Sequence, residues 1–191
     1  YDGATIFVQD TGKVVRELLW NDLQDSYTAA PISLLASDII SGVQQVSVFF
    51  GNTTGPEQWA TMVNDDGTIA IYHSVRSEKI AAWIPCTTDG TFESITELNG
   101  IIYASVKRTI NSATVYYLEK FNFDRTVDCA VNLSSVSGTT WSGLAHLKAK
   151  QASVIDGNLY HGPYTVNSSG QVVLDEAASA PEAGLTFTRT I

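Results

Sequence analysis

Residues 64–120 constrain the fold more than any other part of the sequence. Two turn sequences there, Asp65-Asp66-Gly67 and Asp89-Gly90, place a carboxylate beside a glycine that can adopt a positive φ, which is the pairing that closes tight hairpins. Runs rich in β-branched and aromatic residues surround these turns, at positions 68–72, 80–84, 101–106 and 114–118. So many strands in so short a stretch leave no room for helices, and the sequence therefore predicts an antiparallel β-meander.

The part that precedes this meander is also predicted to be mainly β. Residues 4–20 form a hairpin pattern around Asp10-Thr11-Gly12, residues 21–30 are polar and typical of turns, and residues 46–50 and 58–63 are strand-like around a loop at 51–56. The exception is the segment 31–40, whose apolar residues recur at three- and four-residue spacing. Pro31 suits a first helical turn and Gly42 a stop, so this segment predicts the one short helix.

A domain boundary is predicted near Phe123, where the sequence becomes more polar and the strand-like runs become shorter. Residues 1–123 then form a β-rich part and residues 124–191 a second small domain. In the second domain, residues 134–140 are typical of a loop, and residues 154–160, 164–166 and 171–174 of hairpin strands. The predicted class is all-β, mainly antiparallel, with a small sandwich or barrel at the C-terminal end.

Composition and charge exclude several classes of protein. The chain has 191 residues, 44% of them hydrophobic, and a formal net charge of −9 with 11 Lys and Arg, so a nucleic-acid ligand is disfavoured. No apolar run approaches the ~20 residues of a membrane helix, and no signal peptide is recognisable at the N-terminus. Because the chain starts at Tyr1 and stops at Ile191 after a strand-like run, we expect it to be a piece of a longer protein.

Candidate catalytic and metal-binding residues are few. The histidines His73, His146 and His161 have no metal-ligand spacing, and Cys86 and Cys129 are far apart, which favours two thiols over a disulfide framework. No Gly-x-Ser-x-Gly elbow is present. Arg16 and Glu17 are adjacent in an apolar strand, so alternation points one of them inward, where a charge needs a partner, unless the strand is a solvated edge.

Two enzyme-like or ligand-like patterns remain. The carboxylates Asp65, Asp66, Asp89 and Glu93 could serve glycoside hydrolysis, but turn geometry already accounts for the three Asp residues. The four tryptophans could stack on sugars, although tryptophan in a sheet is more often buried; they are Trp20, Trp59, Trp83 and Trp141. We therefore expect no catalytic, cofactor-binding or metal-binding residues, and no enzyme.

A set of short motifs runs in order through residues 4–121. They lie at 6–12 (Ile-Phe-Val-Gln-Asp-Thr-Gly), 15–18 (Val-Arg-Glu-Leu), 27 (Tyr), 34–36 (Leu-Leu-Ala), 65–70 (Asp-Asp-Gly-Thr-Ile-Ala), 82–83 (Ala-Trp), 88–95 (Thr-Asp-Gly-Thr-Phe-Glu-Ser-Ile), 106–111 (Val-Lys-Arg-Thr-Ile-Asn) and 117–120 (Tyr-Leu-Glu-Lys). The ordered set resembles the tail nozzle, or tail tubular, proteins of short-tailed bacteriophages and of prophages. Ser112, Leu118 and Lys120 depart from it, because the family pattern has Gly, Ile and Arg there.

The resemblance implies a structural virion component rather than an enzyme. Such a protein is synthesised in the bacterial cytoplasm, assembles as a ring of identical subunits with other tail proteins, and forms the conduit through which DNA leaves the capsid. It has a β-propeller-like part, of which residues 1–123 would supply a portion. The resemblance implies neither tight nucleic-acid binding nor a membrane anchor. The alternative class is a carbohydrate- or receptor-binding β-module, whose sugar platform would need exposed tryptophans.

Overall fold

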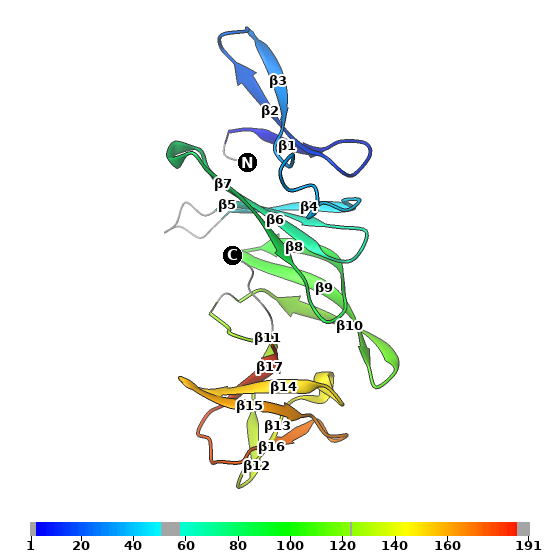
Figure 1. Ribbon diagram of the computed structural model, residues 1–191, viewed down its shortest axis with the longest axis vertical. Coiled ribbons are helices and arrows are strands. Elements are labelled where there is room, and N and C mark those ends of the chain that lie inside the picture. The colour runs from blue at the N-terminus through cyan, green and yellow to red at the C-terminus, as the bar shows by residue number, and fades with distance from the viewer. Residues whose placement is uncertain (1–2, 51–57, 123, 187–191) are drawn as a thin grey trace. The chain divides into compact units, whose positions relative to one another are not determined.

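The computed structural model describes residues 3–50, 58–122 and 124–186, and it is built almost entirely of antiparallel strands (Figure 1). The predicted all-β class is therefore confirmed. None of the sheets in the described part closes into a barrel. The chain divides into two compact units: Tyr1–Lys107 with Tyr116–Phe121, and Arg108–Val115 with Asn122–Ile191. Phe123 lies outside the described residues, and the boundary predicted there stays a prediction.

Three sheets account for the strands up to residue 120. The first sheet contains β1 (Thr5–Val8), β2 (Val15–Asn21) and β3 (Ser26–Pro31), in that order. The second contains β4 (Gln45–Phe50), β5 (Gln58–Val63), β6 (Ile69–Val75) and β7 (Ile80–Cys86), again in chain order. The third contains β8 (Thr91–Leu98), β9 (Ile101–Ile110) and β10 (Ala113–Lys120), with β9 in the middle.

The β4–β7 sheet has hydrophobic packing on both faces. In β6, Ile69 and Ile71 belong to one core cluster with Phe92 and Ile95 of β8, whereas Ala70 and Tyr72 belong to another cluster with Val15 of β2. This division follows from the period of two in a strand, which sends successive side chains to opposite faces. The side chains on both faces of β6 are therefore buried, and a hydrophobic cluster packs against each face of the sheet.

The helix predicted at residues 31–40 is wrong. Pro31 is the last residue of β3, and the Ile32 amide continues the β2–β3 ladder by donating to the Val15 carbonyl at 2.9 Å. Ser33 is buried and its Oγ accepts from the Val15 amide at 2.9 Å, so its backbone is tied to β2. Two turns follow, closed by the amides of Ala36 and Ile39. A helix-like spacing therefore arises from turns that repeat every three residues.

Several strands fall where the sequence predicts turns or loops, or indicates no strand. Among them are β3, most of which lies within residues 21–30, β8 after the Asp89-Gly90 turn, β12 (Ser134–Ser137) within residues 134–140, and the strands at Asp128–Asn132 and Thr140–Ser142. In β3 and β12 nearly every residue is exposed. An exposed strand needs no apolar alternation, and its polar sequence is indistinguishable from that of a loop. The predicted loop at 51–56 lies outside the described residues.

The second unit contains two sheets around one core. The larger has the order β11-β17-β14-β15, with β11 (Asp128–Asn132), β17 (Glu182–Leu185), β14 (Gln151–Asp156) and β15 (Leu159–Thr165). The smaller has the order β12-β13-β16, with β13 (Thr140–Ser142) and β16 (Gln171–Val173). Trp141 and Val172 of the smaller sheet share a cluster with Val154 and Ala183 of the larger. This is the packing of a small sandwich rather than a barrel.

The helical content of the described residues is limited to two short 3-10 segments, η1 (Arg76–Glu78) and η2 (Ala145–Leu147). Neither approaches the length or apolar character of a membrane-spanning helix. The predicted turn at Gly67 is confirmed, because Gly67 has φ of 80° and closes the β5–β6 hairpin. Gly90 also has a positive φ, of 142°, but Asp89-Gly90 joins β7 to β8, which belong to different sheets, so the hairpin predicted there is wrong.

Candidate functional site

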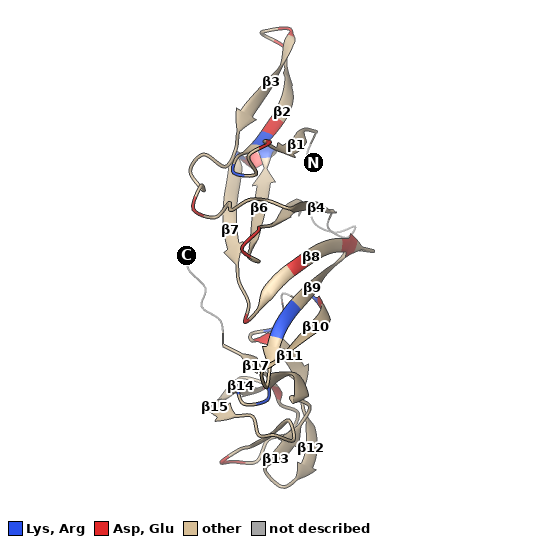
Figure 2. Cartoon of the chain, turned by 90° about the vertical axis from the view of Figure 1, so that its right-hand side faces the viewer, with Lys and Arg blue, Asp and Glu red and all other residues tan. Residues whose placement is uncertain are grey.

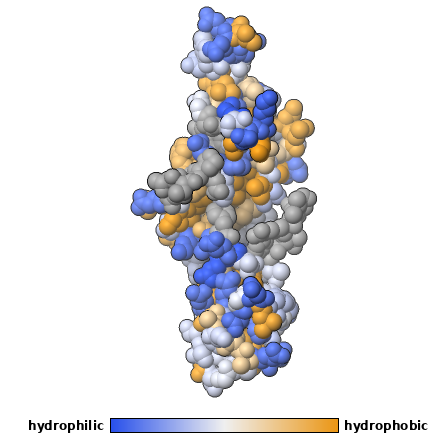
Figure 3. Space-filling model, turned by 90° about the vertical axis from the view of Figure 1, so that its left-hand side faces the viewer, coloured by the Kyte–Doolittle hydropathy of each residue, from blue (hydrophilic) through white to orange (hydrophobic). Residues whose placement is uncertain are grey.

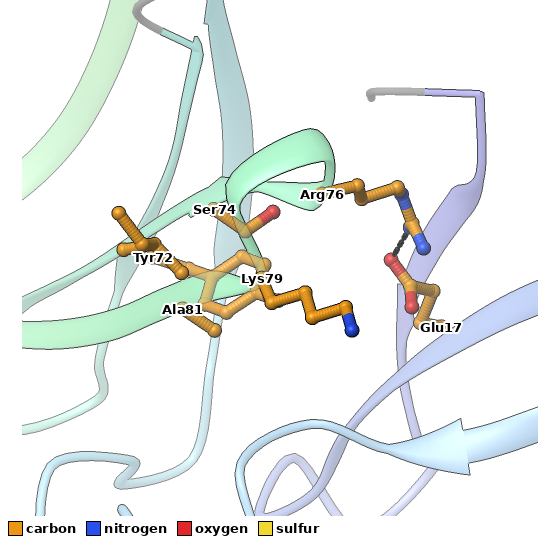
Figure 4. Close-up of a pocket in the computed structure, with 7 residues that line it drawn as sticks. Glu17, Tyr72, Ser74, Arg76, Lys79 and Ala81 are labelled. Carbon is orange, nitrogen blue, oxygen red and sulfur yellow. Dashed lines mark hydrogen bonds and ion pairs between the residues drawn. The ribbon is translucent and has the colours of Figure 1, made fainter.

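A hollow of about 350 Å³ lies in the first unit, beside the η1 turn that joins β6 to β7 (Figure 4). Its lining comes from strands of two sheets and from the turn between β6 and β7: Glu17, Tyr72, Ser74, Arg76, Lys79, Ile80 and Ala81. Glu17 comes from β2, and the others from β6, η1 and the start of β7. The hollow is the candidate binding site of this unit because charged side chains converge on it.

An ion pair between Glu17 and Arg76 crosses one side of the hollow, with Arg76 Nη2 donating to Glu17 Oε1 (Figure 4). Glu17 is 8% exposed, which confirms that one charge of the Arg16-Glu17 pair points inward and finds a partner. Arg16 lies on the opposite face of β2, where it donates from Nε to Gln9 and from Nη1 to the Ala29 carbonyl, both at 3.0 Å. Alternation could not identify Arg76 as the partner, because it lies 59 residues away.

Lys79 adds a second cation to the hollow. It follows η1 with a positive φ of 56°, and its amide donates to the Arg76 carbonyl at 3.0 Å, which closes the turn. Figure 4 shows the Lys79 side chain extending toward the side of the hollow where Glu17 lies. With one carboxylate and two cations, the lining has an excess of positive charge. Among the described residues that line the hollow there is neither histidine nor cysteine, and Glu17 is engaged by Arg76.

The four carboxylates considered for glycoside hydrolysis lie in turns or at an exposed position of a strand. Asp65 Oδ1 accepts from Ser41 Oγ at 2.8 Å, and Asp66 Oδ1 accepts from both the amide and the hydroxyl of Thr68, at 2.9 and 2.7 Å. Glu93 Oε1 accepts from Thr91 Oγ1 at 2.9 Å. Asp89 is exposed next to Gly90. The Asp66 contacts form an Asx-turn, so they explain the residue by geometry; the absence of catalysis stays a prediction.

The three histidines are held separately. His73 Nδ1 contacts the Gln58 carbonyl at 3.0 Å, and His146 Nε2 contacts the Cys129 carbonyl at 2.9 Å. His161 is 6% exposed, and its Nε2 has no hydrogen-bond partner within the described part of the chain. None of the three joins a cluster of potential metal ligands there. Cys86 and Cys129 are both half-buried and are not joined by a disulfide in the structure.

The tryptophans divide into packed and exposed rings. Trp59 is half-buried with its ring centroid 5.7 Å from that of Phe49, and Trp83 is half-buried with its Nε1 donating to the Ile32 carbonyl at 2.9 Å. Trp141 is buried in the second unit. Trp20, by contrast, is 48% exposed and meets Tyr27 edge-on with centroids 5.1 Å apart. Trp59 and Trp83 thus pack against the core clusters without being fully buried, which disfavours a sugar platform on them.

No protein-family model matches the sequence, and the search of curated proteins found no match.

Proposed function

We propose that the chain is a structural component of the tail of a bacteriophage or prophage, part of the nozzle through which DNA leaves the particle. The ordered motifs of residues 4–121 carry this proposal. The β4-β5-β6-β7 sheet supports it, because a four-stranded antiparallel meander in chain order is the arrangement of a β-propeller blade. The polar hollow beside η1 gives no competing catalytic function, since its acid is engaged by Arg76.

The electrostatics also suit a conduit. DNA must pass such a wall without binding, and a net charge of −9 repels the phosphate backbone. Salt screens this repulsion over about 10 Å at ~0.1 M, so it acts on DNA close to the wall. In the view of Figure 2, Lys and Arg form small separate groups rather than the continuous stripe that a DNA-binding surface requires.

The proposal is tested on particles from the host that encodes the chain. After induction of the prophage, we expect its peptides in purified particles, and antibodies against residues 64–120 should label the tail end in electron micrographs. Portal and tail genes should flank the reading frame. Purified particles that lack the chain, or a reading frame without tail genes as neighbours, would contradict the proposal.

A second test uses the isolated chain. It should not retard duplex DNA at physiological salt, because 11 basic residues dispersed in an acidic protein release few counterions. The measurement is a gel-shift assay across a salt series. Retardation that weakens steeply with salt would mean that the chain carries a cationic DNA surface and that the conduit interpretation is wrong.

The alternative, a carbohydrate- or receptor-binding module, is favoured by one observation. Trp20 and Tyr27 are 48% and 68% exposed on the same face of the β2–β3 hairpin, although their rings meet at 76° and form no flat platform. A glycan array followed by fluorescence titration tests this class. Specific binding lost in Trp20→Ala and retained in Trp59→Phe would favour it over the tail component.

A further inference from the structure

The strand β3 is an uncovered sheet edge. It is the outer strand of the β1-β2-β3 sheet, and no other described strand pairs with its far side. All of its residues except Thr28 are exposed. Natural proteins protect such edges with charges, bulges or proline. The sequence Ser-Tyr-Thr-Ala-Ala-Pro has no charge, its register with β2 is continuous, and its proline stands only at the end. The edge is therefore open to pairing.

The hydrogen-bonding parity of β3 identifies the groups on this open edge. The Ile32 amide donates to the Val15 carbonyl. The backbone amides and carbonyls of Ile32 and of every second residue before it therefore point toward β2. Tyr27 and Ala29 then direct their amides and carbonyls outward. The Ala29 carbonyl already accepts from Arg16 Nη1 at 3.0 Å, but a carbonyl oxygen has a second lone pair. Both outward residues can thus still donate and accept.

The face that accompanies this edge is apolar except at one end. Cross-strand register places Trp20 beside Tyr27 and Leu18 beside Ala29, on the face opposite to that of Glu17, and it places Arg16 beside Pro31 at the end of the same face. Tyr27 is 68% exposed and Trp20 48% exposed. In Figure 3 the region of β2 and β3, at the top of the view, is coloured mainly hydrophilic with a small hydrophobic group. A strand added to β3 would extend this face.

We propose that β3 pairs antiparallel with β3 of a second copy of this chain, about a two-fold axis that passes through Thr28. In this register Tyr27 of each copy lies opposite Ala29 of the other, so that every outward amide donates to an outward carbonyl. Shifting the register to place Tyr27 opposite Pro31 leaves the outward carbonyl of Tyr27 without a donor in each copy, because proline has no amide hydrogen. Thr28 then meets Thr28 of the second copy, a favourable cross-strand pair, and no like charges face each other within the paired strands.

The contact is small. A strand of six residues is about 20 Å long, and pairing through one edge buries less than the ~1,200 Å² of a stable specific complex. We therefore expect a reversible pair that forms only at high protein concentration. The proposal is independent of the tail function, because a two-fold edge contact differs from the head-to-tail contacts that a ring requires. If β3 does not pair with a second copy, the tail proposal is unaffected. If the tail proposal is wrong, the β3 contact is likewise unaffected.

Cysteine trapping tests the register. Opposed residues of a non-hydrogen-bonded antiparallel pair have Cα atoms about 4.5 Å apart, within the range of a disulfide. Thr28→Cys should therefore form a disulfide-linked dimer under mild oxidation, with residue 28 joined to residue 28 in peptide mapping. Ser26→Cys is the matched control on the same face, because two copies of residue 26 would lie about 14 Å apart. The parent chain, with Cys86 and Cys129, gives the background.

Equal trapping of Thr28→Cys and Ser26→Cys would overturn the proposal. Adding Ala29→Pro to Thr28→Cys should lower the yield because it removes an outward amide, whereas Ala29→Ser should not. Since proline can also disturb the fold, a charge-swap experiment provides an independent test. Thr28→Lys and Thr28→Glu should each weaken association by up to about fivefold in sedimentation, and mixing them should restore it. A mixture that associates no better than its components would also overturn the proposal.

Discussion

The two N-terminal sheets differ in what covers them. The β4–β7 sheet packs against hydrophobic clusters on both faces, whereas the β1–β3 sheet packs on one face and leaves the Trp20–Tyr27 face in solvent. The β4–β7 sheet carries long apolar runs, and all four of its strands are predicted from the sequence. In the β1–β3 sheet only β1 and β2 are predicted. The comparison shows that a strand can be predicted from its sequence when its side chains are buried, because burial requires apolar residues, whereas an exposed strand has no such pattern.

The same difference decides where stability resides. Burying a large aliphatic side chain contributes about 1.5–3 kcal/mol, and the β4–β7 sheet supplies such residues to both clusters. The edge strand β3 contributes exposed residues only, apart from half-buried Thr28. We therefore expect the free energy of unfolding to be sensitive to substitutions in β5 and β6 and tolerant of those in β3.

The largest effect should come from truncating the centre of the β4–β7 sheet. Met62→Ala, at a residue with 0% exposure, should lower the free energy of unfolding by about 2–5 kcal/mol, because it leaves a cavity. Tyr27→Ala on β3 should cost no more than about 1.5 kcal/mol, the value of a lost aromatic pair. Urea titrations of both variants measure the difference. Equal losses would show that the open sheet is as important to stability as the covered one.

Two glycine substitutions should have a smaller effect on the free energy of unfolding, and comparing them separates steric crowding from backbone strain. Gly67→Val should cost about 2–3 kcal/mol, because Gly67 has φ of 80° and a Cβ there would lie 2.5 Å from Thr91 Cβ. Gly157→Val is the matched control, with φ of 62° and open space around it, and should cost only the strain of about 1–2 kcal/mol. Gly90→Val, at φ of 142°, should also destabilise by ~1 kcal/mol or more. Unchanged melting for Gly67→Val and Gly90→Val would contradict the turn assignment.

The link between the two sheets should be measurable as a coupling energy. Glu17→Gln should cost about 1–2 kcal/mol, less than a fully buried pair, because the Arg76 side chain is 33% exposed and water can replace part of the interaction. Arg76→Gln and the double variant complete a cycle. Arg16→Gln is the control on the other face of β2 and should show no coupling to Glu17→Gln. A zero coupling between Glu17 and Arg76 would mean that the sheets are joined by hydrophobic contacts alone.

The sequence predicts the strands of the covered β4–β7 sheet and misses the exposed strands β3 and β12, but it also misses β8, although Phe92 and Ile95 of β8 are buried. The hairpin turn at Gly67 is predictable because a positive φ favours glycine there, whereas the turn at Gly90 joins two sheets instead of closing the predicted hairpin. The inward charge of Glu17 follows from alternation, but its partner Arg76 is set by tertiary packing. The segment 31–40 was assigned to a helix because turns that repeat every three residues mimic a helical period. The hollow beside η1 combines β2 with β6 and β7, a proximity that no local pattern encodes.

The smallest effect concerns a loop that is held by hydrogen bonds. The amides of Ser179 and Ala180 donate to the Asp156 carboxylate at 2.7 and 3.2 Å, and they hold its pKa below the ordinary value of 3.8. Because the pKa of Asp156 is lower in the folded state than in the unfolded state, the carboxylate stabilises the fold at pH values above the pKa of the unfolded state. This stabilisation is lost as the pH falls through the pKa of the folded state. The native chain should therefore lose stability between about pH 5 and pH 3, and Asp156→Asn should lose less over the same interval.

Thermal melts of the native chain and Asp156→Asn from pH 7 to pH 3 measure this difference. Asp175→Asn is a suitable control, because that carboxylate contacts the Tyr164 hydroxyl at 3.1 Å instead of a pair of amides. Its pH profile should follow that of the native chain more closely. Parallel profiles for the native chain and Asp156→Asn would mean that the two amides hold the loop without favouring the ionised carboxyl.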